Sequence, residues 1–274
     1  MSQQHNNTYT VGFVAVMSIV CALILSVTSS ALKKRIDQNV LEATQLDVMS
    51  SAFALKADQG KSEEEFVKKD ELLAQFANTK IVILDYQGKD LTDKVRNGAS
   101  DEVFAKDVFK INPRKQEKEL KAGKIEEKDL ELPLFVLNKE DGSVDSYTLP
   151  IWGKGLWGDI NGYLSLEADK KTVRGITFLS DHKETPGLGA EMTKFGWRSQ
   201  FIGKQIFNND GKLKPVGVVK GRVADVKPNS QEFYVDGLAG STLTCNGITA
   251  MLDNCLEIYK PFLEAKPASE KKED

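Results

Sequence analysis

The feature that most constrains this 274-residue chain is an uncharged apolar run near its N-terminus. Residues 11–27 are almost entirely apolar, and residues 1–32 contain no Lys, Arg, Asp or Glu. A helix of about 20 such residues spans the hydrocarbon layer of a bilayer. Ser29-Ser30-Ala31 could serve as a cleavage site, so a cleaved signal peptide is the alternative. However, a basic n-region is missing and the run exceeds the usual h-region of about 7–15 residues, so we predict a retained membrane anchor over residues 1–32.

The rest of the chain is compatible with a packed core, because 41% of all residues are hydrophobic and 28% are charged. A net charge of −3 with both signs interspersed argues against a nucleic-acid partner. Cys245 and Cys255 lie on one predicted helix, about 15 Å apart along its axis, which is too far for a disulfide. Together with Cys21, His5 and His182 they form no recognisable metal-ligand spacing, so we expect no metal site.

Composition and patterning divide the chain after the anchor into three parts. Residues 33–131 are predicted to form a helical stalk followed by a charged α/β segment. Within it, residues 56–71 are interpreted as a solvated loop with a short helix, and residues 80–86 as a strand. Residues 132–265 are predicted to form the main domain, and residues 266–274 a disordered polar tail. The function of residues 56–131 cannot be deduced from their pattern.

The main domain begins with short β-rich runs separated by glycine turns, at residues 134–137, 146–152, 160–166 and 173–179. This pattern predicts an antiparallel sheet. Residues 153–158 match G-x-G-x-x-G, but a dinucleotide-binding motif must open a helix, and turn and strand residues follow here. We therefore predict no dinucleotide site at this position.

Helices are predicted on either side of a further strand. Residues 192–207, which include Phe195, Trp197 and Phe201, are interpreted as a helix, and residues 215–219 as a strand. From Ile248 to Phe262, apolar side chains recur at helical spacing and predict an amphipathic helix whose stripe packs in the core. The predicted fold class is α+β: one transmembrane helix, then a soluble domain with an antiparallel sheet and flanking helices.

Residues 236–247, Asp-Gly-Leu-Ala-Gly-Ser-Thr-Leu-Thr-Cys-Asn-Gly, form a turn that leads into this helix. Exposed amides at a helix N-terminus bind anions, although Ser and Thr at such places are ordinarily caps. The run resembles the flavinylation motif of covalent FMN-binding domains, in which the last hydroxyl residue is esterified to the FMN phosphate. That residue is Thr242 here, while Ala239 and Ser241 depart from the usual pattern. By the same resemblance, Asp236 and Gly237 are recognised by the flavin transferase, and we expect them on an exposed turn.

Three blocks in the same order make the chain similar to the C subunit of the sodium-translocating NADH:quinone reductase. They are Gly-Lys-Gly-Leu-Trp at residues 153–157, Glu-Thr-Pro-Gly-Leu-Gly at residues 184–189 and the motif at residues 236–247. Residues 197–204 also look like this family. The related G subunit of the Rnf electron-transport complex tends to lack the first block, which favours the reductase.

The resemblance implies an electron-relay subunit with covalently attached FMN in a sodium-pumping complex of the bacterial inner membrane. It implies the other subunits, membrane lipid and an FAD-dependent flavin transferase as partners. No catalytic residue is expected, because the protein's task is to place and tune the flavin. The residues implied to bind the flavin are Trp157, Glu184, Thr185, Gly187, Leu188, Gly189, Gly240, Ser241, Leu243 and Thr244.

The resemblance also places the flavin domain on the outer, periplasmic face. Lys33, Lys34 and Arg35 follow the anchor directly and by the positive-inside rule favour the opposite orientation, but large domains can override this bias. Two other functions remain: a stand-alone membrane-tethered FMN electron carrier and a flavin-free anchored interaction domain. Co-purification with multi-span subunits would distinguish the reductase subunit from the stand-alone carrier. A yellow colour would distinguish both of these from the flavin-free interaction domain.

Overall fold

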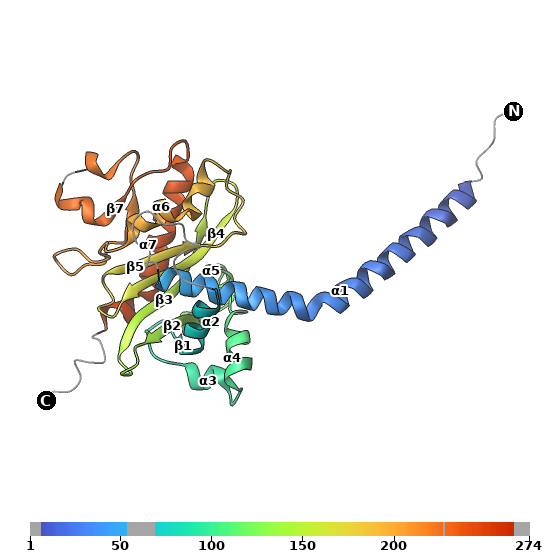
Figure 1. Cartoon of the computed structure of the whole chain (residues 1–274), viewed down its shortest axis with the longest axis horizontal. Coiled ribbons are helices and arrows are strands. Elements are labelled where there is room, and N and C mark those ends of the chain that lie inside the picture. Colours follow the sequence, from blue (N-terminus) through green and yellow to red (C-terminus); the bar gives the residue numbers. More distant parts are fainter. Residues whose placement is uncertain (1–6, 54–68, 227, 266–274) are drawn as a thin grey trace. The chain divides into compact units, whose positions relative to one another are not determined.

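The computed structural model describes residues 7–53, 69–226 and 228–265 (Figure 1). The chain divides into two compact units, residues 1–43 and residues 44–274. Its helices are α1 (Asn7–Ala52), α2 (Lys69–Ala77), α3 (Thr92–Arg96), α4 (Asp101–Val108), α5 (Pro113–Lys121), α6 (Phe195–Arg198) and α7 (Thr242–Glu264). Its strands are β1 (Thr79–Leu84), β2 (Leu132–Asn138), β3 (Val144–Lys154), β4 (Asp159–Glu167), β5 (Val173–Phe178), β6 (Gly217–Val218) and β7 (Tyr234–Val235).

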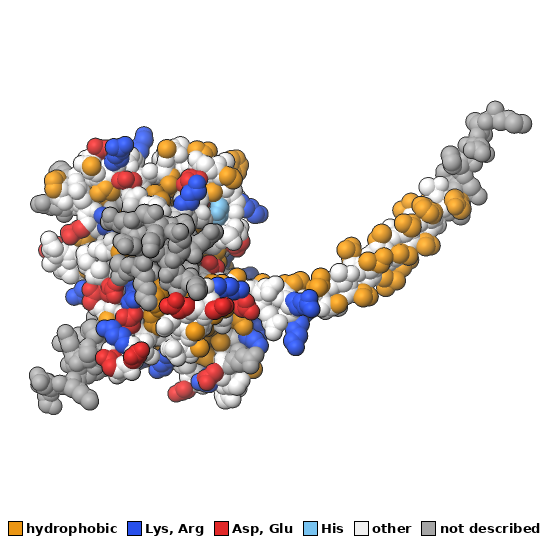
Figure 2. All heavy atoms as spheres, in the orientation of Figure 1, with side chains coloured by type: hydrophobic (Ala, Val, Ile, Leu, Met, Phe, Trp, Pro, Cys, Tyr) orange, Lys and Arg blue, Asp and Glu red, His pale blue; other side chains and the backbone are white. Residues whose placement is uncertain are grey.

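The first unit consists of the N-terminal part of α1, a continuous helix of 46 residues. By length and composition, this helix is sufficient to cross a membrane. Its apolar side chains, among them Phe13, Val16 and Leu25, are exposed, and Figure 2 shows them along the helix. A helix of this length measures about 69 Å, about twice a hydrocarbon layer of about 30 Å, so only the apolar part can lie in the membrane. The predicted continuation of the anchor as a helix beyond residue 32 is confirmed.

The second unit is built around a five-stranded sheet in the order β1-β2-β3-β4-β5. Every neighbouring pair is antiparallel, as the glycine-punctuated pattern predicts. Residues 132–137 are buried without a break because both faces of the sheet are covered. Leu134 and Val136 face one core and Phe135 and Leu137 the other, as the two-residue period of a strand requires.

One face of the sheet is covered by the C-terminal end of α1 together with α2 and α4. Val48, Met49 and Ala52 from α1 pack with Phe76 from α2 and Phe104 from α4 in a core of their own. The last turns of α1 therefore belong to the globular unit. β1, which lies before the predicted boundary at residue 132, is one of the two edge strands of the same sheet.

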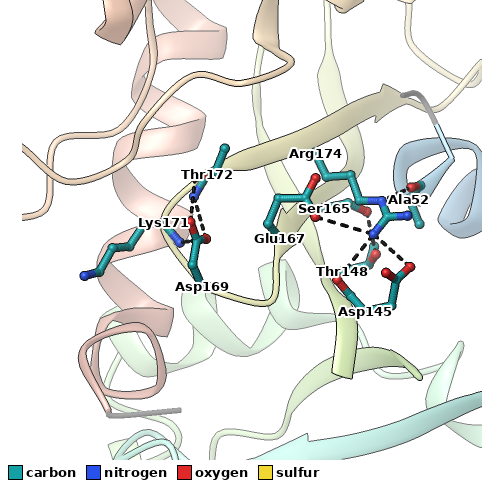
Figure 3. A network of polar contacts seen from close by, with 9 residues as sticks. All are labelled: Ala52, Asp145, Thr148, Ser165, Glu167, Asp169, Lys171, Thr172 and Arg174. Carbon is teal, nitrogen blue, oxygen red and sulfur yellow. Dashed lines mark hydrogen bonds and ion pairs between the residues drawn. The ribbon is translucent and has the colours of Figure 1, made fainter. Parts of the chain in front are cut away.

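An arginine joins the end of α1 to the sheet (Figure 3). Arg174 on β5 donates from Nε to the Ala52 carbonyl oxygen at 2.5 Å and forms an ion pair with Asp145 at 2.8 Å. The Oγ atoms of Ser51 and Ser165 lie 2.8 Å apart beside it. Carbonyl groups in the last turn of a helix have no partner within the helix, so the Arg174 guanidinium supplies one.

The other face of the sheet is covered by α7, whose apolar stripe is buried as predicted. The Tyr259 hydroxyl donates to the Pro133 carbonyl oxygen at 2.7 Å, and the Cys255 thiol contacts the backbone of Trp152. Burial raises the pKa of Cys255 to about 12, so this thiol stays protonated at neutral pH. Cys255 therefore has the predicted packing role.

The predicted helix over residues 192–207 is wrong. The segment forms a 3-10 turn over Gly189–Thr193, the single turn α6 and a second 3-10 turn over Ser199–Phe201. The buried guanidinium of Arg198 donates to the carbonyl oxygens of Thr193 and Ile176, and Gly203 adopts a left-handed conformation with φ of 78°. Tertiary contacts and a left-handed glycine thus interrupt a pattern that is locally helical.

The sequence predictions for residues 54–68 and 266–274 lie outside the described residues. The predicted strand over residues 215–219 is shorter than expected, because only β6 pairs, in parallel with β7. The G-x-G-x-x-G residues 153–158 form the hairpin between β3 and β4, where the Gly155 amide donates to the Gly158 carbonyl oxygen at 2.8 Å. The prediction that these residues do not open a helix is confirmed.

Candidate functional site

The first turn of α7 separates two hydroxyl side chains that are close in sequence. Thr242 and Leu243 are exposed, whereas Thr244 is only 1% exposed and faces the core. Ser241 stands at the N-cap, yet its side chain forms no capping hydrogen bond. The first amides of a helix lack intrahelical partners and can donate hydrogen bonds to an anion. Thr242 is thus the hydroxyl of this turn that an outside reagent can reach.

Gly240 allows the chain to enter this turn. Its φ is 70°, in the left-handed region that side chains disfavour. A Cβ atom there would also lie 2.9 Å from Cδ2 of Leu188. The motif at residues 236–247 and the loop at residues 184–189 therefore contact each other through Leu188 and Gly240, which is close to Thr242 in the sequence.

A buried carboxylate lies beneath this contact. Glu184 is 5% exposed and its Oε2 accepts a hydrogen bond from the Thr244 hydroxyl at 2.5 Å. Its Oε1 accepts from the backbone amide of Trp157 at 3.0 Å. In the described part of the chain, no Lys or Arg forms an ion pair with Glu184. Two glycines provide space: a Cβ at Gly155 would lie 2.4 Å from Oε1, and one at Gly189 would lie 2.7 Å from Oε2.

Three large apolar side chains are exposed on the segments that surround Thr242. Trp157 is 64% exposed, Leu243 60% and Leu188 41%. Leu188 is carried by a tight turn in which Gly187 has φ of 75° and the Leu188 amide donates to the carbonyl oxygen of Thr185 at 3.1 Å. Exposed apolar side chains near an anion site suit a ligand with a flat apolar ring and a phosphate.

Asp236 and Gly237 contact a different part of the structure. Asp236 is half-buried: its Oδ1 accepts from the Val223 amide at 2.7 Å, and its amide donates to Oε1 of Gln200 at 2.9 Å. Its carbonyl oxygen accepts from the indole of Trp197 at 2.8 Å. The expectation of a freely exposed turn is therefore wrong, because side chains from residues 197–200 enclose this backbone.

Other groups near the site carry no sign of bond-making chemistry. Burial raises the pKa of the Cys245 thiol, which accepts from the Leu238 amide at 3.3 Å. His182 accepts from the Glu184 amide at 3.2 Å. No cluster of metal-binding side chains occurs among the residues that the structure describes.

A groove of about 430 Å³ lies elsewhere, along the C-terminal half of α7. Its walls include Tyr86, Leu120, Trp152 and Ile258. None of the residues predicted to bind the flavin lines this groove.

Sequence reasoning missed several residues on which the site depends. Gly247 lets α7 approach β3, since a Cβ there would lie 2.2 Å from the Lys154 carbonyl oxygen. Trp197 and Gln200 hold the backbone of Asp236. Gly155 was noted in the G-x-G-x-x-G match and in the block at residues 153–157, but its close approach to Glu184 was not foreseen. The glycines themselves are visible in the sequence and indicate positions of close approach. The sequence does not indicate which other segment of the chain lies against each glycine.

Comparison with known proteins defines the class of this site. The family model of the FMN-binding domain matches residues 155–257, a range that holds the Trp157 hairpin, the 184–189 loop and the start of α7. An exposed hydroxyl at a helix start, with apolar side chains around it, fits the phosphate and ring of this cofactor. The class is thus an FMN-binding domain carried behind an N-terminal apolar helix.

The full-length matches are more specific. The C subunit of the Na(+)-translocating NADH-quinone reductase of Vibrio vulnificus is 33% identical over 259 residues, which cover 93% of either protein. The chain belongs to the family of C subunits of the Na(+)-translocating NADH-quinone reductase. The Yersinia pestis member is 42% identical over 115 residues, 42% of this chain and 41% of that protein. The crystal structure of the member from Parabacteroides distasonis is similar with a TM-score of 0.63 and 28% identity, covering 86% of this chain and 98% of that one.

Proposed function

We propose that this chain relays electrons through an FMN esterified to Thr242. The chain is a membrane-anchored, single-pass flavoprotein subunit of a sodium-translocating NADH:quinone reductase, with the other subunits as its partners. The observation that carries the attachment site is the exposed hydroxyl of Thr242 at the uncapped start of α7. An ester there directs the phosphate toward helix amides that lack partners.

The flavin supplies the electron transfer, and the residues of this chain bind and orient it. Exposed Trp157, Leu188 and Leu243 provide apolar surface for the ring beside Thr242. The residues proposed to form the flavin site, either at its surface or supporting it from below, are Trp157, Glu184, Thr185, Gly187, Leu188, Gly189, Gly240, Ser241, Leu243 and Thr244. A match over 93% of the Vibrio vulnificus reductase subunit supports the reductase over an Rnf G-type subunit or a stand-alone carrier.

We propose that a flavin transferase recognises Asp236 and Gly237 and transfers FMN from FAD to the Thr242 hydroxyl. The new phosphoester replaces the pyrophosphate bond of FAD, and AMP leaves with the hydroxyl proton. Intact-mass measurement of the purified chain should show the addition of one FMN less one water. Asp236→Ala should lower the modified fraction. The fold should persist, because losing one half-buried hydrogen bond costs about 1 kcal/mol.

The matched variant is Asp236→Asn, which keeps an oxygen that accepts from the Val223 amide but removes the charge. A low modified fraction in both variants supports recognition of the carboxylate. Full modification of Asp236→Asn would show that only the hydrogen bond matters, and an unmodified wild-type chain would contradict the covalent flavin.

We propose that the flavin domain lies on the periplasmic face, with α1 in contact with membrane lipid. A protease added to intact spheroplasts should degrade the domain, despite Lys33, Lys34 and Arg35. Large translocated domains are less sensitive to such charge bias, which is the physical basis for this expectation. A cytoplasmic protein is the control for spheroplast integrity. Cleavage only after lysis would place the domain in the cytoplasm.

A further inference from the structure

The carboxylate of Glu184 connects the three sequence blocks that surround the flavin site. Its own loop carries Leu188, its Oε1 accepts from the amide of Trp157 in the β3–β4 hairpin, and its Oε2 accepts from Thr244 in the first turn of α7. Thr244 is two residues beyond Thr242, on the inward side of the same turn. The exposed surface of the site therefore rests on a buried polar centre.

Both side-chain oxygens of Glu184 are engaged at this centre, one by the Trp157 amide and the other by the Thr244 hydroxyl. A buried polar group that loses its hydrogen-bond partners is costly, so these two contacts favour keeping the segments together. The sites of Gly155 and Gly189 lie so close to the two oxygens that a side chain at either position would displace the carboxylate. Gly155 and Gly189, which lie in separate sequence blocks, thus both leave space for the Glu184 carboxylate.

We propose that Glu184 is a positioning residue for the flavin, holding the Trp157 hairpin and the Thr242 turn at the separation that seats the ring. This inference rests on the proposed attachment of FMN at Thr242. Glu184 acts through Trp157 and Thr244 from beneath the surface. Removing its carboxylate leaves the Thr242 hydroxyl available, so attachment persists while the surroundings of the ring change.

The test uses the full chain in detergent, prepared with and without co-expressed flavin transferase. In the flavin-free Glu184→Ala chain, the Trp157 backbone amide should exchange hydrogen about tenfold faster than in wild type, because its acceptor is gone. In the flavin-loaded chain, the modified fraction should match wild type, while the absorption maximum and midpoint potential of the flavin should shift. The control is Glu140→Ala, an exposed glutamate between β2 and β3, outside the three segments that Glu184 connects.

Glu184→Gln keeps the side-chain volume and is the substitute if Glu184→Ala does not fold. The glutamine amide has only one acceptor oxygen, so we expect smaller changes in the same three quantities: the exchange rate of the Trp157 amide, the absorption maximum and the midpoint potential of the flavin. Wild-type exchange at Trp157 would overturn the proposal, as would an unchanged flavin spectrum and potential in a variant with faster exchange. If the wild-type chain carries no flavin, the proposed function fails, whereas the exchange measurement still decides whether Glu184 holds these segments together.

Discussion

Thr242→Ala yields a folded chain without covalently bound flavin, the largest expected effect on function. The helix dipole at the start of α7 stabilises a phosphate by roughly 0.3–1 kcal/mol, which is too weak to retain a ligand on an open surface. The ester makes flavin binding intramolecular, so its loss removes the cofactor altogether. The measurement is ultraviolet fluorescence of the chain on a denaturing gel, where only covalent flavin remains.

Thr244→Ala is the matched control, because this hydroxyl is buried and donates to Glu184. Its band should still fluoresce, and Thr242→Ser keeps a hydroxyl at the attachment position. A fluorescent Thr242→Ala band beside a dark Thr244→Ala band would assign the ester to the other threonine. Absence of fluorescence in every band, including wild type, would refute covalent attachment.

Gly247→Ala should destabilise the domain by forcing α7 away from β3. The added Cβ would lie 2.2 Å from the Lys154 carbonyl oxygen, a backbone atom that cannot rotate away. α7 must then move off β3, and overpacking of this kind costs roughly 1–3 kcal/mol and occasionally more. Alanine is favoured over glycine within a helix by about 1 kcal/mol, which offsets only part of this cost.

The expected net loss is about 1 kcal/mol, which lowers the melting temperature by about 2–4 °C for a domain of this size. Thermal unfolding of the flavin-free chain, followed by circular dichroism, measures it. Asn246→Ala is the control, since Asn246 is exposed on the same helix turn. A melting temperature of Gly247→Ala at or above that of the control would mean that α7 and β3 are farther apart than the structure places them.

Elements with a strong local pattern could be predicted from sequence. The apolar run at residues 11–27, the strands β2 to β5 and the stripe of α7 all follow a local pattern of apolar residues. That pattern is present in the sequence itself. For residues 192–207 the helix predicted from hydrophobic spacing was wrong. The hydrogen bonds of the buried Arg198 guanidinium and the left-handed conformation of Gly203 determine the backbone there, and hydrophobic spacing does not encode either.

The candidate site shows the same division. Its motif, its helix start and its hydroxyl residues were recognisable in residues 236–247, and the resemblance indicated flavin chemistry. The expectation for Asp236 was wrong in its exposure, because the partners Gln200 and Trp197 come from another segment. The resemblance singled out Thr242 as the attachment residue, and the structure adds that Thr242 is exposed whereas Thr244 is buried.

The sequence by itself determined an apolar anchor, an antiparallel sheet, an amphipathic C-terminal helix and the family of the flavin motif. Each depends on residues that are neighbours along the chain. Only the tertiary structure decided that Glu184 is buried and bonded to Thr244, 60 residues away, and that the end of α1 belongs to the globular core. Such contacts depend on how separate elements pack and on where glycines permit close approach, and no local period carries that information.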